Sequence, residues 1–175
     1  AEFIVKNQQF HCDGSPLDGA YLIYDNKDKQ MYFDELDTDR NASRERLMMG
    51  LFLAKYLQYY PNDVIYESLI KYYRFVAREF YNEETGEVYN AIRRNPEFKR
   101  LYNAPWMSVF VMEMYKLTKD KSYLEKMFKL LTVYYSIGGD SFYPNGLSIF
   151  ESVEALNEAG MYDKAKELKI MYQKH

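Results

Sequence analysis

The segment that decides the fold is LMMGLFLAKYLQYYPNDVIYESLIKYYRFV, residues 47–76. Its first half is apolar on nearly every side, as expected for a helix that is enclosed by protein. A turn containing Pro61 and Asn62 follows, and the second half then mixes apolar and charged residues at helical spacing. This pattern predicts two antiparallel helices joined by a tight turn, the first enclosed and the second with one face in water.

The same unit recurs twice farther along the chain. Trp106–Leu117 and Ile149–Asn157 are each followed by a short turn and by an amphipathic segment that contains a tyrosine, Tyr123 or Tyr162. Recurrence of one unit indicates a stack of helical hairpins whose connecting loops gather at the ends. We therefore expect an all-α fold with three antiparallel hairpins, built from helices over residues 41–59, 63–81, 104–118, 120–136, 148–158 and 161–173.

Residues 1–38 have a different character. Phe3-Ile4-Val5 and Tyr21-Leu22-Ile23-Tyr24 are β-prone runs, and turn-forming residues such as Asp13-Gly14-Ser15-Pro16 lie between them. We expect extended segments and loops here, with at most one small hairpin. The predicted organisation is an extended N-terminal segment of residues 1–38 and a helical-hairpin region of residues 39–175, within a single domain overall.

Composition excludes several classes of function. The 175 residues are 47% hydrophobic, which is enough for a core, and 23 basic against 26 acidic residues give a net charge of -3. The two signs are interspersed, so no basic footprint for nucleic acid is present. No apolar run approaches the roughly 20 residues of a membrane span. We predict neither a nucleic-acid partner nor a membrane-spanning segment.

Histidine and cysteine are too few for several catalytic or metal-binding arrangements. His11 lies in the irregular N-terminal region and His175 ends the chain, so a Ser/His/Asp arrangement is not expected. Cys12 is the only cysteine, so no internal disulfide and no zinc-type spacing exists. No phosphate-binding glycine loop is found either. We predict no cofactor, and these residues do not indicate a cellular compartment.

An acidic loop precedes the first helix. Residues 34–41 read DELDTDRN, with four carboxylates within six positions. One interpretation is a general acid or base; the other is that Asp37, Asp39 or Asn41 caps the helix that follows. The same residues begin like a calcium-binding loop, but Ala42 stands where that loop needs its glycine and Met48 where it needs its glutamate. We therefore predict no metal site.

Aromatic residues and asparagines precede two of the enclosed helices. Tyr102-Asn103-Ala104-Pro105-Trp106 opens one, and Tyr143-Pro144-Asn145-Gly146 precedes the next. Aromatic rings are rigid apolar surfaces that suit the face of a sugar ring, and equally the contact between two hairpins. Trp106 thus has two interpretations, a stacking platform for a sugar or a large core residue.

Some of these stretches resemble a known family. The run Asp18-Gly19-Ala20-Tyr21, then Asp39-Arg40-Asn41 leading into the helix from Arg44 to Leu57, is similar to the entry into a helical hairpin of six-hairpin, (α/α)6-toroid glycosidases. Asn103-Ala104-Pro105-Trp106 before an enclosed helix fits the same pattern. The resemblance covers about residues 18–172.

The resemblance implies a carbohydrate-active protein, related to glycoside hydrolases, that binds a poly- or oligosaccharide in a cleft at one end of the helical array. Hydrolysis of a glycosidic bond needs two carboxyl groups roughly 5 to 9.5 Å apart. The candidate catalytic residues are Asp37, Asp39, Asp140 and Glu151. Arg40 and Arg44 would neutralise a substrate carboxylate such as that of a uronic acid. The candidate substrate-binding residues are Arg40, Asn41, Arg44, Tyr102, Asn103, Trp106, Tyr143 and Asn145.

We expect three hairpins in this chain, whereas a closed toroid of this family has six. The chain is then a C-terminal portion of a longer enzyme, an open partial toroid, or a protomer that completes its surface by association with another copy. An enzyme acting on polysaccharides would be periplasmic or extracellular. The alternative is a non-enzymatic scaffold, because Ala155–Ala165 resembles the turn of a tetratricopeptide-type repeat, whose concave face binds peptides.

Overall fold

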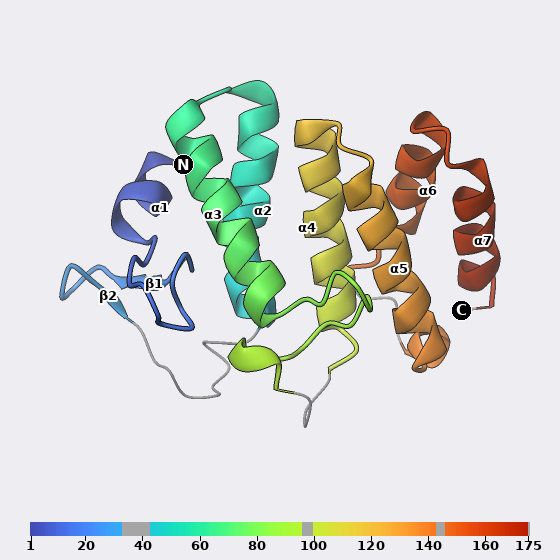
Figure 1. The fold of residues 1–175 in the computed structure, drawn as a ribbon, viewed down its shortest axis with the longest axis horizontal. Coiled ribbons are helices and arrows are strands. Elements are labelled where there is room, and N and C mark those ends of the chain that lie inside the picture. The colour runs from blue at the N-terminus through green and yellow to red at the C-terminus, as the bar shows by residue number, and fades with distance from the viewer. Residues whose placement is uncertain (33–42, 96–99, 143–145, 175) are drawn as a thin grey trace. The chain divides into compact units, whose positions relative to one another are not determined.

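The computed structural model of the chain describes residues 1–32, 43–95, 100–142 and 146–174, with side chains in the second range described from residue 47. Within this part, the chain forms seven α-helices and one small antiparallel sheet of two strands (Figure 1). The predicted all-α class is therefore confirmed. None of the described helices is both long enough and apolar enough to cross a membrane.

Two compact units make up the chain. Unit 1 contains residues 1–81 and 89–98, and unit 2 contains residues 82–88 and 99–175. The elements of unit 1 are α1 (Glu2–Asn7), β1 (Ile23–Asp25), β2 (Gln30–Tyr32), α2 (Ser43–Tyr59), α3 (Asp63–Glu79) and the short 3-10 helix η2 (Ile92–Arg94). The elements of unit 2 are α4 (Asn103–Thr118), α5 (Ser122–Ser136), the 3-10 helix η3 (Gly139–Ser141), α6 (Ile149–Glu158) and α7 (Tyr162–Tyr172). The predicted boundary between residues 38 and 39 lies outside the described residues.

Local signals in the sequence explain the three helical hairpins. Asn62 caps α3, because its side chain accepts a hydrogen bond from the Ile65 amide at 3.0 Å. Lys119 ends α4 in the left-handed conformation. After α6, Gly160 has a φ of 78°, and the Gly160 and Met161 amides donate to the carbonyls of Asn157 and Leu156. That arrangement is the Schellman motif, in which glycine best tolerates the positive φ.

The hairpins of unit 2 are tied together by polar contacts as well as by apolar ones. The Lys121 ammonium, just before α5, donates to the Ala159 carbonyl at 2.6 Å, and Lys164 of α7 pairs with Glu125 of α5 at 3.2 Å. Beneath these contacts, α4 and α5 bury apolar side chains on facing sides, including Phe110, Met114, Leu124, Met127 and Leu131. The α6/α7 pair therefore packs on α5.

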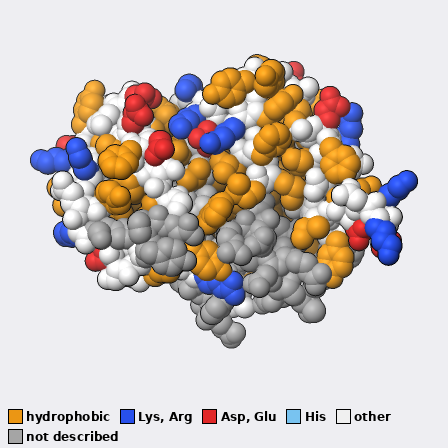
Figure 2. Space-filling model, turned by 180° about the vertical axis from the view of Figure 1, so that it is seen from behind, with side chains coloured by type: hydrophobic (Ala, Val, Ile, Leu, Met, Phe, Trp, Pro, Cys, Tyr) orange, Lys and Arg blue, Asp and Glu red, His pale blue; other side chains and the backbone are white. Residues whose placement is uncertain are grey.

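Helix α2 is less enclosed by protein than the sequence predicts. The pattern predicts that α2 and α4 are both enclosed on every side, and α4 is indeed buried along most of its length. In α2, however, Met48 and Phe52 keep 47% and 48% of their surface exposed, so this helix has an uncovered apolar face. Hydrophobic side chains do reach the molecular surface among the charged ones (Figure 2).

The N-terminal segment forms in part as expected. The small hairpin exists: β1 and β2 pair antiparallel, with Tyr24 opposite Met31. The β-prone run Phe3-Ile4-Val5 was wrongly predicted as extended, because it lies inside helix α1. Short apolar runs do not distinguish helix from strand, and here Lys6 pairs with Glu2 one turn earlier at 2.9 Å, which favours the helix.

A buried polar network joins this segment to α3. Ser68 donates to the Gln9 side-chain oxygen at 2.7 Å, so the Tyr21 hydroxyl, 2.7 Å from the Ser68 hydroxyl, must be the donor in the second bond. The Tyr21 ring stacks on Tyr72 with centroids 4.5 Å apart. Burial raises the pKa of Tyr21 far above its usual value. These contacts hold residues 9–21 firmly against α3.

Candidate functional site

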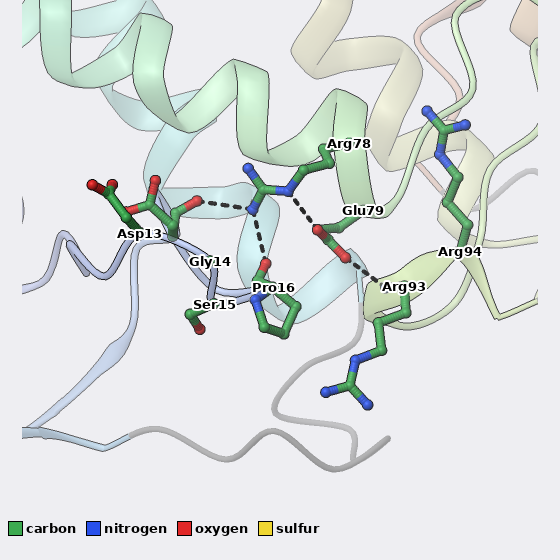
Figure 3. A pocket seen from close by; sticks show the side chains of 9 residues that line it. Asp13, Gly14, Ser15, Pro16, Arg78, Glu79, Arg93 and Arg94 are labelled. Atoms are coloured by element: carbon green, nitrogen blue, oxygen red, sulfur yellow. Dashed lines mark hydrogen bonds and ion pairs between the residues drawn. The ribbon is translucent and has the colours of Figure 1, made fainter.

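An open cleft of about 890 Å³ lies in unit 1, where the turn at residues 13–18, the C-terminal end of α3 and η2 meet (Figure 3). Its volume falls within the range of ligand-binding clefts. Polar and charged side chains dominate the lining, which consists of Asp13, Gly14, Ser15, Pro16, Asp18, Arg78, Glu79, Arg93 and Arg94.

One wall of the cleft is the turn at residues 13–18. The Asp18 carboxylate accepts a hydrogen bond from the Cys12 amide at 2.9 Å and pairs with the Lys71 ammonium at 3.2 Å. Burial raises the pKa of Asp18, but the Cys12 amide, Lys71 and Arg78 together outweigh it, so the net pKa is lowered. The turn is thus closed around an ionised carboxylate.

Arg78 fastens that turn to α3. Its guanidinium group donates to the carbonyl oxygens of Pro16 and Asp18, at 2.9 and 3.0 Å, and to the Glu79 carboxylate (Figure 3). The planar fork of an arginine suits such simultaneous bonds. The spacing from Arg78 to Pro16 is 62 residues along the chain, so this contact is a tertiary one.

Glu79 is the buried centre of the cleft, with 5% of its surface exposed. One carboxylate oxygen accepts from Arg78, and the other accepts from the Arg93 backbone amide at 2.7 Å. A buried carboxylate is tolerated when both oxygens are bonded in this way, because charge-assisted hydrogen bonds replace its water. Glu79 therefore connects the end of α3 to η2.

Arg93 and Arg94 have unusual backbones, with φ of 65° and 48°. A residue other than glycine costs about 1–2 kcal/mol in this left-handed region. Arg94 donates to the Ala77 carbonyl at 2.7 Å, which satisfies one of the last carbonyls of α3. The Arg93 side chain is exposed, and Figure 3 shows it pointing away from that of Arg94. Neither arginine was predicted as a site residue from the sequence.

In unit 2, the structure brings together the predicted residues at the start of α4. Asn103 is fully buried, and the Tyr102 hydroxyl accepts a hydrogen bond from the Arg100 guanidinium at 2.5 Å. The Trp106 side chain is half-buried, and its indole N–H is buried with no hydrogen-bond partner among the described residues. Arg100 was not predicted, although its place two residues before Tyr102 puts it in the same turn.

The predicted carboxylates of unit 2 lie on different elements. Asp140 is exposed in η3, and Glu151 is exposed in the first turn of α6. No hydrogen bond or ion pair among the described residues links the two. Near Asp140, burial raises the pKa of Tyr135 to about 12, with smaller contributions from Tyr134, Tyr172 and the Asp140 charge.

The other predicted residues lie outside the part of the chain that the structure describes. Asp37, Asp39, Arg40, Asn41, Tyr143 and Asn145 are not among the described residues, and neither is the side chain of Arg44. Their roles stay predictions. Within the described ranges, no group of three or more His, Cys, Asp and Glu side chains is arranged to hold a metal ion.

Comparison with known proteins finds a similar solved structure but no matching family. No protein-family model matches the chain, and no curated protein matches it. A solved structure of a polysaccharide lyase is similar, with a TM-score of 0.89 and 28% sequence identity over 99% of this chain. The match covers 26% of the lyase, so the chain spans about a quarter of its length. The helical fold is thus similar to part of a carbohydrate-active enzyme.

Proposed function

We propose that this chain is the helical part of a carbohydrate-active protein that binds a polysaccharide. The observation that carries the proposal is the similarity to the polysaccharide lyase, which extends over 99% of the chain at 28% identity and a TM-score of 0.89. Sequence identity at that level, together with close agreement of the backbone, supports a relationship in function as well as in fold. The match covers 26% of the lyase. We therefore propose that this chain binds a polysaccharide, and that catalysis requires a longer assembly.

The reaction class that this similarity favours is elimination rather than hydrolysis. In an elimination, a base removes the proton from the carbon beside a carboxyl group. The glycosidic C–O bond on the neighbouring carbon breaks, a C=C bond forms, and the leaving oxygen takes up a proton. Such a reaction needs a uronic acid, and it does not need the two opposed carboxylates of a glycosidase. The predicted glycosidase activity is therefore the less favoured of the two.

The proposed sugar contacts in unit 2 are those before and within the first turn of α4. Tyr102 presents a hydroxyl that is hydrogen-bonded to a guanidinium group, and Trp106, four positions later in the sequence, presents a half-buried ring. An aromatic face together with a charge-assisted polar group is a common way to hold a sugar ring. Tyr102 and Trp106 are our candidates for contact with the polysaccharide.

Binding assays with the whole chain test this proposal. We would titrate it by calorimetry with polygalacturonate, alginate and neutral xylan, and repeat the titrations with Trp106→Ala. Tyr59→Ala is the matched control, because Tyr59 is an aromatic residue with 78% of its surface exposed in a different turn. We expect binding of at least one polymer, weakened about tenfold by Trp106→Ala and unchanged by Tyr59→Ala. If the wild-type chain binds none of the polymers, the proposal is wrong.

A further inference from the structure

We infer that a groove on the α6/α7 hairpin binds an amphipathic helix that is basic on one flank and acidic on the other. The inference does not depend on polysaccharide binding, and every residue that it uses lies in unit 2. The α6/α7 hairpin packs on α5 and lies at one end of unit 2 (Figure 1). Its exposed side chains are therefore placed to receive a further element.

Two adjacent hollows form the groove. The first, of about 620 Å³, lies along α6, and the second, of about 240 Å³, lies between α6 and α7. Both are lined by Val153 and Asn157, so they are continuous. The spacing of Phe150, Val153, Glu154 and Asn157 is that of one face of a helix. A hollow that follows two neighbouring helices has the shape that a third helix fills.

Exposed aromatic rings mark the two ends of the groove. Phe150, with 75% of its surface exposed, begins α6 and makes an edge contact with Tyr172 at the end of α7, with ring centroids 5.9 Å apart. Tyr162, with 67% exposed, begins α7 at the opposite end. Val153 and Ala165 lie between them in the lining. Aromatic anchors of this kind contribute much of the binding free energy at protein interfaces.

The two helices contribute opposite charges to the groove. The lining contains three glutamates of α6 and two lysines of α7, namely Glu151, Glu154, Glu158, Lys166 and Lys169. In the described part of the chain, none of these five side chains forms a hydrogen bond or an ion pair. A helix lying in the groove would pair all of them if its basic flank faced α6 and its acidic flank faced α7. This charge pattern defines the chemistry of the partner.

The contact between α7 and α5 shows how such a helical joint forms in this protein. Lys164 of α7 pairs with Glu125 of α5 at 3.2 Å, and its ammonium lies 5.8 Å from the centre of the Phe128 ring. Lys166 is two positions farther along, which places it on roughly the opposite side of α7. The groove thus repeats the components of the α5 joint: lysines, glutamates and an exposed aromatic ring.

The probe for this inference is a synthetic peptide of about 20 residues, long enough to form a helix. It carries leucines at helical spacing, lysines on one flank of that stripe and glutamates on the other. A second peptide has the same composition in an order that destroys the stripe. Binding of each fluorescein-labelled peptide to the whole chain is measured by fluorescence anisotropy.

Four variants of the chain accompany the wild type. Glu154→Lys and Lys166→Glu each reverse one charge in the groove, and Phe150→Ala removes an aromatic anchor. Glu167→Lys is the matched control, because Glu167 is exposed on α7 but does not line the groove. All four side chains are exposed, so the variants should melt close to the wild-type temperature.

We expect the wild type to bind the amphipathic peptide at least about tenfold more tightly than the reordered one. Phe150→Ala should weaken that binding about tenfold. Glu154→Lys and Lys166→Glu should each weaken it about fivefold, and this difference should shrink in about 0.5 M salt. Glu167→Lys should leave the affinity unchanged.

Several results overturn the inference and leave the proposed function standing, because polysaccharide binding is titrated separately. They are equal affinity for the two peptides, binding of neither peptide, or equal losses for Glu167→Lys and Glu154→Lys. Sedimentation of the chain alone is a further check. Self-association that Glu154→Lys abolishes would show that a second copy of the chain occupies the groove, which also contradicts the inference.

Discussion

Two regions of the molecule are each stabilised by a different kind of interaction: the N-terminal part of unit 1 by hydrogen bonds, and the α4/α5 pair of unit 2 by apolar packing. Residues 9–18 are fixed to α3 by a few directional bonds, from Gln9 to Ser68 and from Arg78 to the carbonyls of Pro16 and Asp18. The α4/α5 pair is held by apolar side chains that repeat with the helical period. The difference separates two tasks: periodic apolar packing builds the scaffold, and long-range polar contacts shape the cleft.

The largest effect that we expect concerns the apolar pair. Phe110 of α4 is completely buried, so Phe110→Ala should lower the free energy of unfolding by about 3–5 kcal/mol. Urea denaturation followed by far-UV circular dichroism measures this loss. Tyr162→Ala, which truncates a side chain that is 67% exposed, should change the free energy by less than about 0.5 kcal/mol. Similar losses for the two variants would contradict the contrast between buried scaffold and surface.

A second prediction addresses the directional bonds. Ser68→Ala removes the hydroxyl that donates to Gln9 and accepts from Tyr21, so each of these buried side chains loses a hydrogen bond. We expect a loss of about 2 kcal/mol in the free energy of unfolding, from the same denaturation experiment. Tyr21→Phe combined with Ser68→Ala should recover part of that loss, since the buried Tyr21 hydroxyl is removed together with the acceptor that it bonds. Ser136→Ala, at an exposed helix end, is the control, and a loss as small as its own would show that the network adds nothing.

The smallest effect concerns pH. The pKa of Asp18 is lowered in the folded protein, so the stability that its ionised form contributes is present above the unfolded pKa and is lost as the pH falls through the folded value. Asp18→Asn should therefore cost about 0.5–1 kcal/mol at neutral pH, and the difference from wild type should shrink in acid. Urea titrations at several pH values measure it, with Asp13→Asn on the same turn as the control. A difference that persists unchanged in acid would exclude this explanation.

The helical elements could be predicted from the sequence because their determinants are local. The predicted helix over residues 63–81 is observed as Asp63–Glu79, and that over 104–118 as Asn103–Thr118. Their caps and turns, such as Asn62 and Gly160, lie within a few residues of the ends that they define. Helix α1 was missed because its six residues are too few for a period to be recognised.

The candidate site was predictable to a smaller degree. Tyr102, Asn103 and Trp106 lie together because one helical turn brings them together, which spacing alone indicates. The cleft of unit 1 depends on contacts across about 60 residues, such as that between Arg78 and Asp18, and on a left-handed backbone at two arginines. No local sequence pattern predicts either of these two features. Burial of Glu79 likewise depends on the tertiary fold, because its position on α3 alone resembles that of an ordinary surface charge.

The positions of two single-copy residues have a practical consequence. Cys12, the only cysteine, is exposed in unit 1, and its amide bonds to a residue that lines the cleft. Trp106, the only tryptophan, belongs to unit 2. A thiol-reactive dye on Cys12 and the intrinsic emission of the indole are therefore two independent optical reporters, one in each unit. Titrating an acidic oligosaccharide while both signals are recorded would tell which unit it engages, without any engineered substitution.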